Sequence, residues 1–130
     1  MKSAVYYAVV TFTLCSCSSL PPIEQRLIGR WVMTGAGEHR ADGPSVRHEL
    51  AQQMEVTFTQ DHREVWSNPD GQPVVARWHL EGSDLVFTII SKPKDMEMPT
   101  TPQRERLVRV TDRELVFTDG KTDGVFERVR

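Results

Sequence analysis

Residues 74–90 read VVARWHLEGSDLVFTII, and this stretch decides the fold class. Apolar side chains occupy every second position of its first seven residues, which is typical of a strand with one buried face. The polar residues EGSD at 81–84 predict a turn, and the apolar alternation resumes at Leu85, Phe87 and Ile89. The stretch therefore predicts two antiparallel strands joined as a hairpin.

The same rhythm of a short apolar strand and a polar turn runs through the rest of the chain. It predicts further strands over residues 29–34, 54–59, 64–67, 104–110, 115–118 and 125–129. With about eight strands in sequential hairpins and hardly any helix, the chain is expected to be all-β, an antiparallel up-and-down meander. Such a meander removes its exposed edges most economically by closing into a small barrel.

Other segments interrupt this rhythm. Residues 23–28 (IEQRLI) predict a short helical turn that Gly29 ends. Residues 35–45 are expected to be a Gly-rich loop, and residues 46–53 suit a short capped helix. Residues 92–103 predict a long polar loop, because their prolines cannot donate the hydrogen bonds of a strand ladder.

The N-terminal residues predict an export signal. Lys2 provides a positively charged start, and residues 4–14 form an uncharged and mostly apolar run. This run is shorter than the roughly 20 residues that a membrane-spanning helix needs. It is therefore expected to be a cleavable signal peptide.

The end of this run, Leu14-Cys15-Ser16-Cys17, resembles the lipobox of bacterial lipoproteins. In that family the signal is cut in front of a cysteine whose thiol carries a diacylglycerol. The resemblance implies a signal peptide over residues 1–16 and a lipidated Cys17 that begins a short tether over residues 17–22. The folded domain is then expected over residues 23–130.

Cys15 is the alternative lipid acceptor, and an ordinary secretory signal with two incidental cysteines is the other interpretation. Ser18 follows Cys17, and in the lipoprotein family a residue other than Asp at this position implies delivery to the outer membrane. The expected location is therefore the cell envelope of a two-membrane bacterium. The lipid would lie in the outer membrane and the domain in the periplasm.

The composition narrows the possible functions. The chain has no cysteine after Cys17, so the domain is expected to fold without a disulfide and to lack a thiolate nucleophile. Lys and Arg number 16 against 18 Asp and Glu, with both signs interspersed. This nearly neutral balance gives no reason to expect nucleic acid as a partner. At 130 residues the chain is expected to form one domain with a modest core.

Gly29-Arg30-Trp31 at the start of the first strand, between a helical turn and a meander, resembles the small bacterial lipocalin-like domains of the calycin group. In that family the tryptophan of Gly-x-Trp closes one barrel end, and an arginine near the last strand packs across it. The resemblance implies that Gly29 and Trp31 take these places, with Arg128 or Arg130 as the arginine. The second and third motifs of the larger vertebrate lipocalins are absent, which argues against a roomy cavity.

The interior of an eight-stranded barrel holds either packed side chains or one small ligand. The aromatic residues expected to face inward are Trp31, Phe58, Trp66, Trp78, Phe87, Phe117 and Phe126. Most are expected to fill the core, and Trp66 is the expected exception because its short strand ends at an exposed turn. The candidate ligand contacts are Trp66, Trp78 and Phe87.

The sequence contains no recognisable catalytic set, so a protein without enzymatic activity and without a cofactor is expected. The histidines, at positions 39, 48, 62 and 79, lie on separate expected elements and lack the spacing of zinc ligands. Met96-Glu97-Met98 and the Asp119–Gly124 turn weakly resemble copper and calcium sites but lack the remaining ligands. No metal site is expected.

Three functions remain, and an enzyme on a lipocalin-like scaffold is the weakest of them. The first is binding of a small apolar ligand or an envelope lipid at the barrel mouth, by a domain anchored to the membrane through its N-terminal lipid. The alternative is a non-enzymatic interaction or inhibitor protein that contacts another envelope protein through residues 35–47 and 92–103. A roomy apolar cavity would favour the first function, and a filled interior would favour the second.

Overall fold

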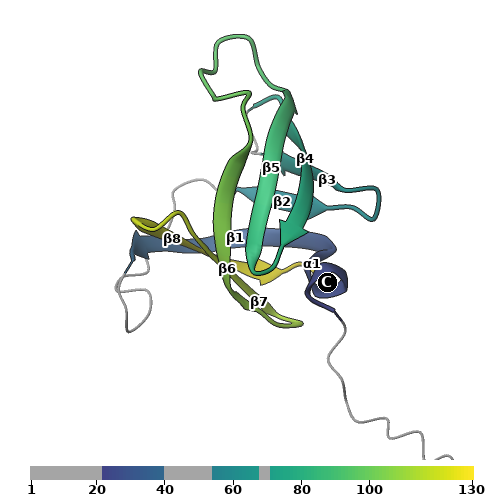
Figure 1. The fold of residues 1–130 in the computed structure, drawn as a ribbon, viewed down its shortest axis with the longest axis vertical. Coiled ribbons are helices and arrows are strands. Elements are labelled where there is room, and N and C mark those ends of the chain that lie inside the picture. The colour runs from purple at the N-terminus through teal and green to yellow at the C-terminus, as the bar shows by residue number, and fades with distance from the viewer. Residues whose placement is uncertain (1–21, 40–53, 68–70) are drawn as a thin grey trace, which may run out of the picture.

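The computed structural model describes residues 22–39, 54–67 and 71–130. Among these residues, one short helix, α1 (Ile23–Leu27), precedes eight strands. The strands are β1 (Gly29–Glu38), β2 (Glu55–Phe58), β3 (Arg63–Ser67), β4 (Val74–Glu81), β5 (Asp84–Ser91), β6 (Gln103–Val110), β7 (Glu114–Thr118) and β8 (Thr122–Arg128). Each strand pairs antiparallel with the next, and β8 pairs with β1, so the sheet closes into a barrel (Figure 1). The expected all-β meander is confirmed.

β1 is longer than the sequence predicts. A loop is expected from residue 35, whereas β1 continues to Glu38, which lies opposite Thr122 of β8. The prediction is therefore wrong for residues 35–38, and β8 begins at Thr122 rather than at residue 125. A bulge between Met33 and Gly35 accommodates the change of register. The long ladder with β8 holds these glycines in an extended conformation and overrides their poor strand propensity.

The other strands begin and end within one residue of their predicted bounds. α1 lies where the helical turn is expected, and residues 92–102 form the long connection between β5 and β6. The expected helix over residues 46–53, the signal peptide, and Cys17 with most of its tether lie outside the described residues. In the part of the chain that the structure describes, no helix has the length and apolar character to cross a membrane.

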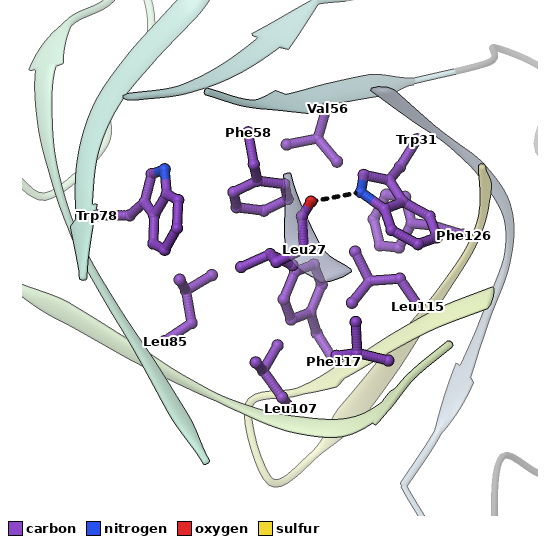
Figure 2. Packing of buried hydrophobic residues seen from close by; sticks show 11 residues of the cluster. Leu27, Trp31, Val56, Phe58, Trp78, Leu85, Leu107, Leu115, Phe117 and Phe126 are labelled. Atoms are coloured by element: carbon purple, nitrogen blue, oxygen red, sulfur yellow. Dashed lines mark hydrogen bonds between the residues drawn. The ribbon is translucent and has the colours of Figure 1, made fainter. Parts of the chain in front are cut away.

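Side chains fill the barrel at the end covered by α1, which we call the closed end (Figure 2). Leu27 of α1 is fully buried and lies in the middle of the ring of strands. Around it the aromatic rings meet edge to face: the ring centroids of Phe58 and Trp78 are 5.7 Å apart, and those of Phe117 and Phe126 are 5.6 Å apart. At this end of the barrel, the inward-facing aromatic residues fill the core, as the sequence predicts.

Gly29, Trp31 and Arg128 meet at the closed end. The indole Nε1 of Trp31 donates a hydrogen bond of 2.9 Å to the carbonyl oxygen of Leu27, which ties β1 to α1. The guanidinium of Arg128 lies 4.2 Å from the centre of the Trp31 ring, a cation–π contact. Its Nη1 donates to the carbonyl oxygen of Ile28 at 2.9 Å. Thus Arg128, rather than Arg130, packs across the tryptophan.

The conformation of Gly29 explains why this position has no side chain. Its φ is +136°, a backbone conformation that residues with a side chain rarely adopt. A Cβ atom at this position would also lie 2.5 Å from Nη1 of Arg128. Glycine therefore allows Arg128 to approach the backbone and lie over Trp31.

Candidate ligand-binding site

The β5–β6 connection lies at the end of the barrel opposite α1 (Figure 1). The residues that line a hollow in the structure gather at this end. The hollow, which we call the open-end cavity, has a volume of about 250 Å3. Its apolar wall includes Trp66, Val74, Ala76, Phe87, Ile89 and Met98. The barrel therefore has a packed closed end and a hollow open end.

The alternation of β4 and β5 builds two walls of this cavity. Ala76 lies opposite Ile89, and Trp78, further toward the closed end, lies opposite Phe87. Ala76 is buried but contributes only a methyl group, whereas the next inward residue of β4 is the large Trp78. The change from tryptophan to alanine along one strand face accounts for part of the space.

The β5–β6 connection contributes two methionines to the cavity, Met96 and Met98. The Nζ of Lys92 donates to the carbonyl oxygen of Met96 at 2.7 Å, and the backbone N–H of Met96 donates to the carbonyl oxygen of Pro93 at 3.2 Å. These bonds shape the first part of the connection into a turn. Methionine side chains are flexible and adapt to irregular apolar surfaces, so this segment suits a cover over a bound apolar group.

A carboxyl group is buried beside the cavity. Glu64 of β3 has no exposed surface, and the indole Nε1 of Trp66 donates to its Oε1 at 2.8 Å. Its Oε2 is buried and makes no hydrogen bond with any of the described residues. Burial raises the pKa of Glu64 to about 8, against the lowering effect of the Trp66 hydrogen bond, and the charge of Glu105 raises it further.

Glu105 of β6 lines the open-end cavity and also an adjoining hollow of about 160 Å3 between β1, β7 and β8. Burial raises the pKa of Glu105, and the charge of Asp119 adds to this effect. Asp123 is buried and lines the adjoining hollow, and its Oδ1 lies 2.7 Å from Nδ1 of His39. The polar part of the open end is therefore mainly acidic.

The structure brings together two of the three candidate ligand contacts. Trp66 and Phe87 both line the open-end cavity and are partly buried. Trp78 does not line it, because its ring is 1% exposed in the packed core and stacks on His62 with a centroid distance of 4.7 Å. Its indole N–H donates to the carbonyl oxygen of Arg63 at 3.1 Å. Trp78 is thus part of the structural core.

The sequence reasoning missed Glu64 and Glu105. A signal for Glu64 exists, since it shares the strand face of Trp66 two residues later and therefore points inward. A charged residue on the apolar face of a strand is uncommon in a core and marks a position worth testing. No local signal reveals that Oε2 of Glu64 makes no hydrogen bond with the described residues, because that depends on which side chains lie across the barrel.

The described histidines lie apart and each faces an acidic residue. Nε2 of His62 lies 2.8 Å from Oε1 of Glu24, and Nε2 of His79 lies 3.6 Å from Oε1 of Glu81. His48 lies outside the described residues. Within residues 22–39, 54–67 and 71–130, no three His, Cys, Asp or Glu side chains converge as a metal site would require.

Comparisons with known proteins relate the chain to others through its fold. No protein-family model matches it, and no curated protein matches its sequence. Among solved structures, a lipocalin-like protein from Bacteroides uniformis ATCC 8492 is similar, with a TM-score of 0.62 and 14% sequence identity. The match covers 80% of this chain and 99% of that one. At this identity the likeness shows the fold alone, and it supports a lipocalin-like domain.

Proposed function

We propose that this chain is a lipid-anchored lipoprotein of the cell envelope whose lipocalin-like domain binds a small apolar ligand, or one chain of an envelope lipid, without catalysing a reaction. The observation that carries the proposal is the open-end cavity, an apolar hollow in a barrel whose other end is packed. A lipocalin-like fold is typically that of a binding protein. The wall residues Trp66 and Phe87 offer flat apolar surfaces, and Met96 and Met98 lie over them.

The size of the cavity limits the ligand. Pockets for small molecules usually measure about 300–1,000 Å3. With about 250 Å3, the open-end cavity is just below this range. A short alkyl or single-ring compound matches this volume, and a longer chain would extend past the β5–β6 connection.

Binding is tested by native mass spectrometry of the domain purified from its own envelope, with the lipoprotein signal replaced by an ordinary secretion signal. All strands of the closed barrel lie within residues 29–128, so this form retains the barrel. We expect a co-purifying apolar molecule. Ala76→Phe fills the cavity, so the apolar molecule should no longer co-purify with this variant. Val108→Ala, on the exposed face of β6, should still co-purify with the molecule. A co-purifying protein with no small molecule would favour the interaction function instead.

The anchor is a separate part of the proposal and rests on the lipobox-like residues. Cys17→Ser should leave an unprocessed precursor that no longer incorporates palmitate, and Cys15→Ser should be labelled and processed normally. Labelling that persists in Cys17→Ser and disappears in Cys15→Ser would move the lipid to Cys15. Fractionation of the labelled protein with the outer membrane then tests its location.

A further inference from the structure

The wall of the open-end cavity is mostly apolar, and its polar members are Ser67, Gln72 and Glu105. Glu105 lines the cavity itself. Glu64 lies directly beside the wall, since it pairs across the sheet with Ala76 and precedes Trp66 by two residues on the same strand face. Both Ala76 and Trp66 line the cavity. Glu64 is not itself one of the lining residues, but its neighbours Ala76 and Trp66 are, so it lies next to the cavity wall.

The buried oxygen of Glu64 calls for a hydrogen-bonding partner. Its Oε1 accepts the indole N–H of Trp66, whereas Oε2 is buried and makes no bond with the described residues. A buried polar atom without a partner costs about 1–3 kcal/mol, so such atoms are rare and often mark a functional site. A ligand group that reaches past the wall residues Trp66 and Ala76 would give this atom a partner.

The groups around Glu64 carry negative rather than positive charge. The charged residue that acts on it from across the barrel is Glu105 of β6, and Asp119 of the β7–β8 turn acts on Glu105 in the same direction. Among the described residues, neither the wall of the cavity nor that of the adjoining hollow includes a lysine or arginine. Two basic side chains of the described residues lie near this region, and each has a partner: Nζ of Lys92 donates to the carbonyl oxygen of Met96, and Nδ1 of His39 lies 2.7 Å from Oδ1 of Asp123.

We propose that the open-end cavity selects a cationic amphiphile, a compound with an apolar body and a protonated amine that pairs with Glu64 and Glu105. This inference rests on the proposed function, because it names the class of ligand for the same cavity. The apolar body would contact Trp66, Phe87 and the two methionines. The ammonium group would supply the donor for Oε2 and a countercharge that none of the described residues lining the cavity provides.

The same arrangement disfavours an anionic ligand. A fatty acid would bring a third carboxyl group to two glutamates whose ionised forms repel each other. A neutral alcohol would gain the apolar contacts but not the charge pairing. The expected order of affinity at equal chain length is therefore amine, then alcohol, then carboxylate.

Amine binding should also release a proton. Because the pKa of Glu64 is about 8, this carboxyl group is mostly protonated at pH 7 in the free protein. An ammonium group favours its ionised form, so Glu64 loses its proton to solvent when the amine binds. The other titratable groups of the described residues in this region are Glu105, Asp119 and Asp123 with its partner His39.

The experiment compares octylamine, 1-octanol and octanoate as probes of the secreted barrel, with Trp66 fluorescence and titration calorimetry as readouts. We expect octylamine to bind at least about tenfold more tightly than 1-octanol, as one charge-assisted hydrogen bond would give, and octanoate more weakly than both. Calorimetry in two buffers of different ionisation enthalpy should show proton release with octylamine and none with 1-octanol.

Glu64→Gln and Glu105→Gln should each remove most of the preference for octylamine while leaving the affinity for 1-octanol unchanged. Glu127→Gln, the same change of charge on the exposed face of β8, is the matched control and should keep the preference. If Glu64→Gln does not fold, the preference measured for Glu105→Gln tests the proposal on its own.

The amine assignment would be overturned if octylamine and 1-octanol bound with equal affinity and Ala76→Phe blocked both. Apolar binding in the cavity would then still stand. If none of the three probes binds, both the assignment and the proposed cavity function fail.

Discussion

Glu64 links the burial of one carboxyl group to the stability of the whole barrel. Its pKa rises from 4.5 to about 8 on folding, because burial disfavours the charged form. Between these values the folded protein holds a proton that the unfolded chain has lost. The contribution of Glu64 to the free energy of unfolding should therefore be most favourable below about pH 4.5. It should become less favourable as the pH rises toward 8.

Glu64→Gln should remove much of this pH dependence. The amide oxygen of glutamine still accepts the N–H of Trp66, and the variant loses the cost of a buried charge. We expect the free energy of unfolding of the wild type to fall relative to the variant by up to about 1.4 kcal/mol per pH unit between pH 5 and 8. Urea unfolding at several pH values measures this difference, and parallel curves for the two proteins would contradict the burial of Glu64.

Trp31 and Trp66 should differ in what they contribute to stability. Trp31 is fully buried in the packed closed end, and Trp66 is partly exposed beside the cavity. Trp31→Ala should cost about 3–5 kcal/mol, as is usual when a large buried aromatic is deleted, and Trp66→Ala should cost less. Equal and small losses in chemical unfolding would show that Trp31 does not close the barrel.

At the scale of elements, the connection from residue 92 to residue 102 is expected to act on binding more than on stability. It makes few hydrogen bonds, and its side chains reach the cavity mainly through Met96 and Met98. Replacing it with a Gly-Asp hairpin should change the free energy of unfolding by no more than about 1 kcal/mol, because it removes mostly loop contacts. The same change should weaken the binding of 1-octanol. Unfolding of the shortened protein, or full affinity in it, would contradict this role.

At the scale of the whole molecule, the two ends of the barrel should respond differently to a ligand. The closed end is already packed around Leu27 and Trp31, so a ligand adds no contacts there. Hydrogen exchange followed by mass spectrometry should show new protection with octylamine in β3, in the end of β5 and in residues 92–102. The segment from α1 to Trp31 should exchange at an unchanged rate. Uniform slowing over the whole barrel would instead indicate global stabilisation with no localised site.

The sequence by itself determined the strand order, the barrel class and the residues of the closed end. Alternating apolar positions and turn residues are local features, so the bounds of six of the eight strands needed no knowledge of neighbours in space. Gly29 and Trp31 were found from one short motif. The proposed lipid anchor also rests on sequence alone, since Cys17 lies outside the described residues.

Only the tertiary structure decided the extent of β1, the division of the barrel into a packed and a hollow end, and the acidic groups beside the cavity. Residues 35–38 are extended because β8 lies beside them, and glycine itself carries no signal for that pairing. Trp66 and Trp78 have similar sequence surroundings, yet Trp66 lines the cavity and Trp78 packs in the core. The physical reason is that burial, open space and the charge felt by Glu64 depend on side chains from strands far apart in the sequence.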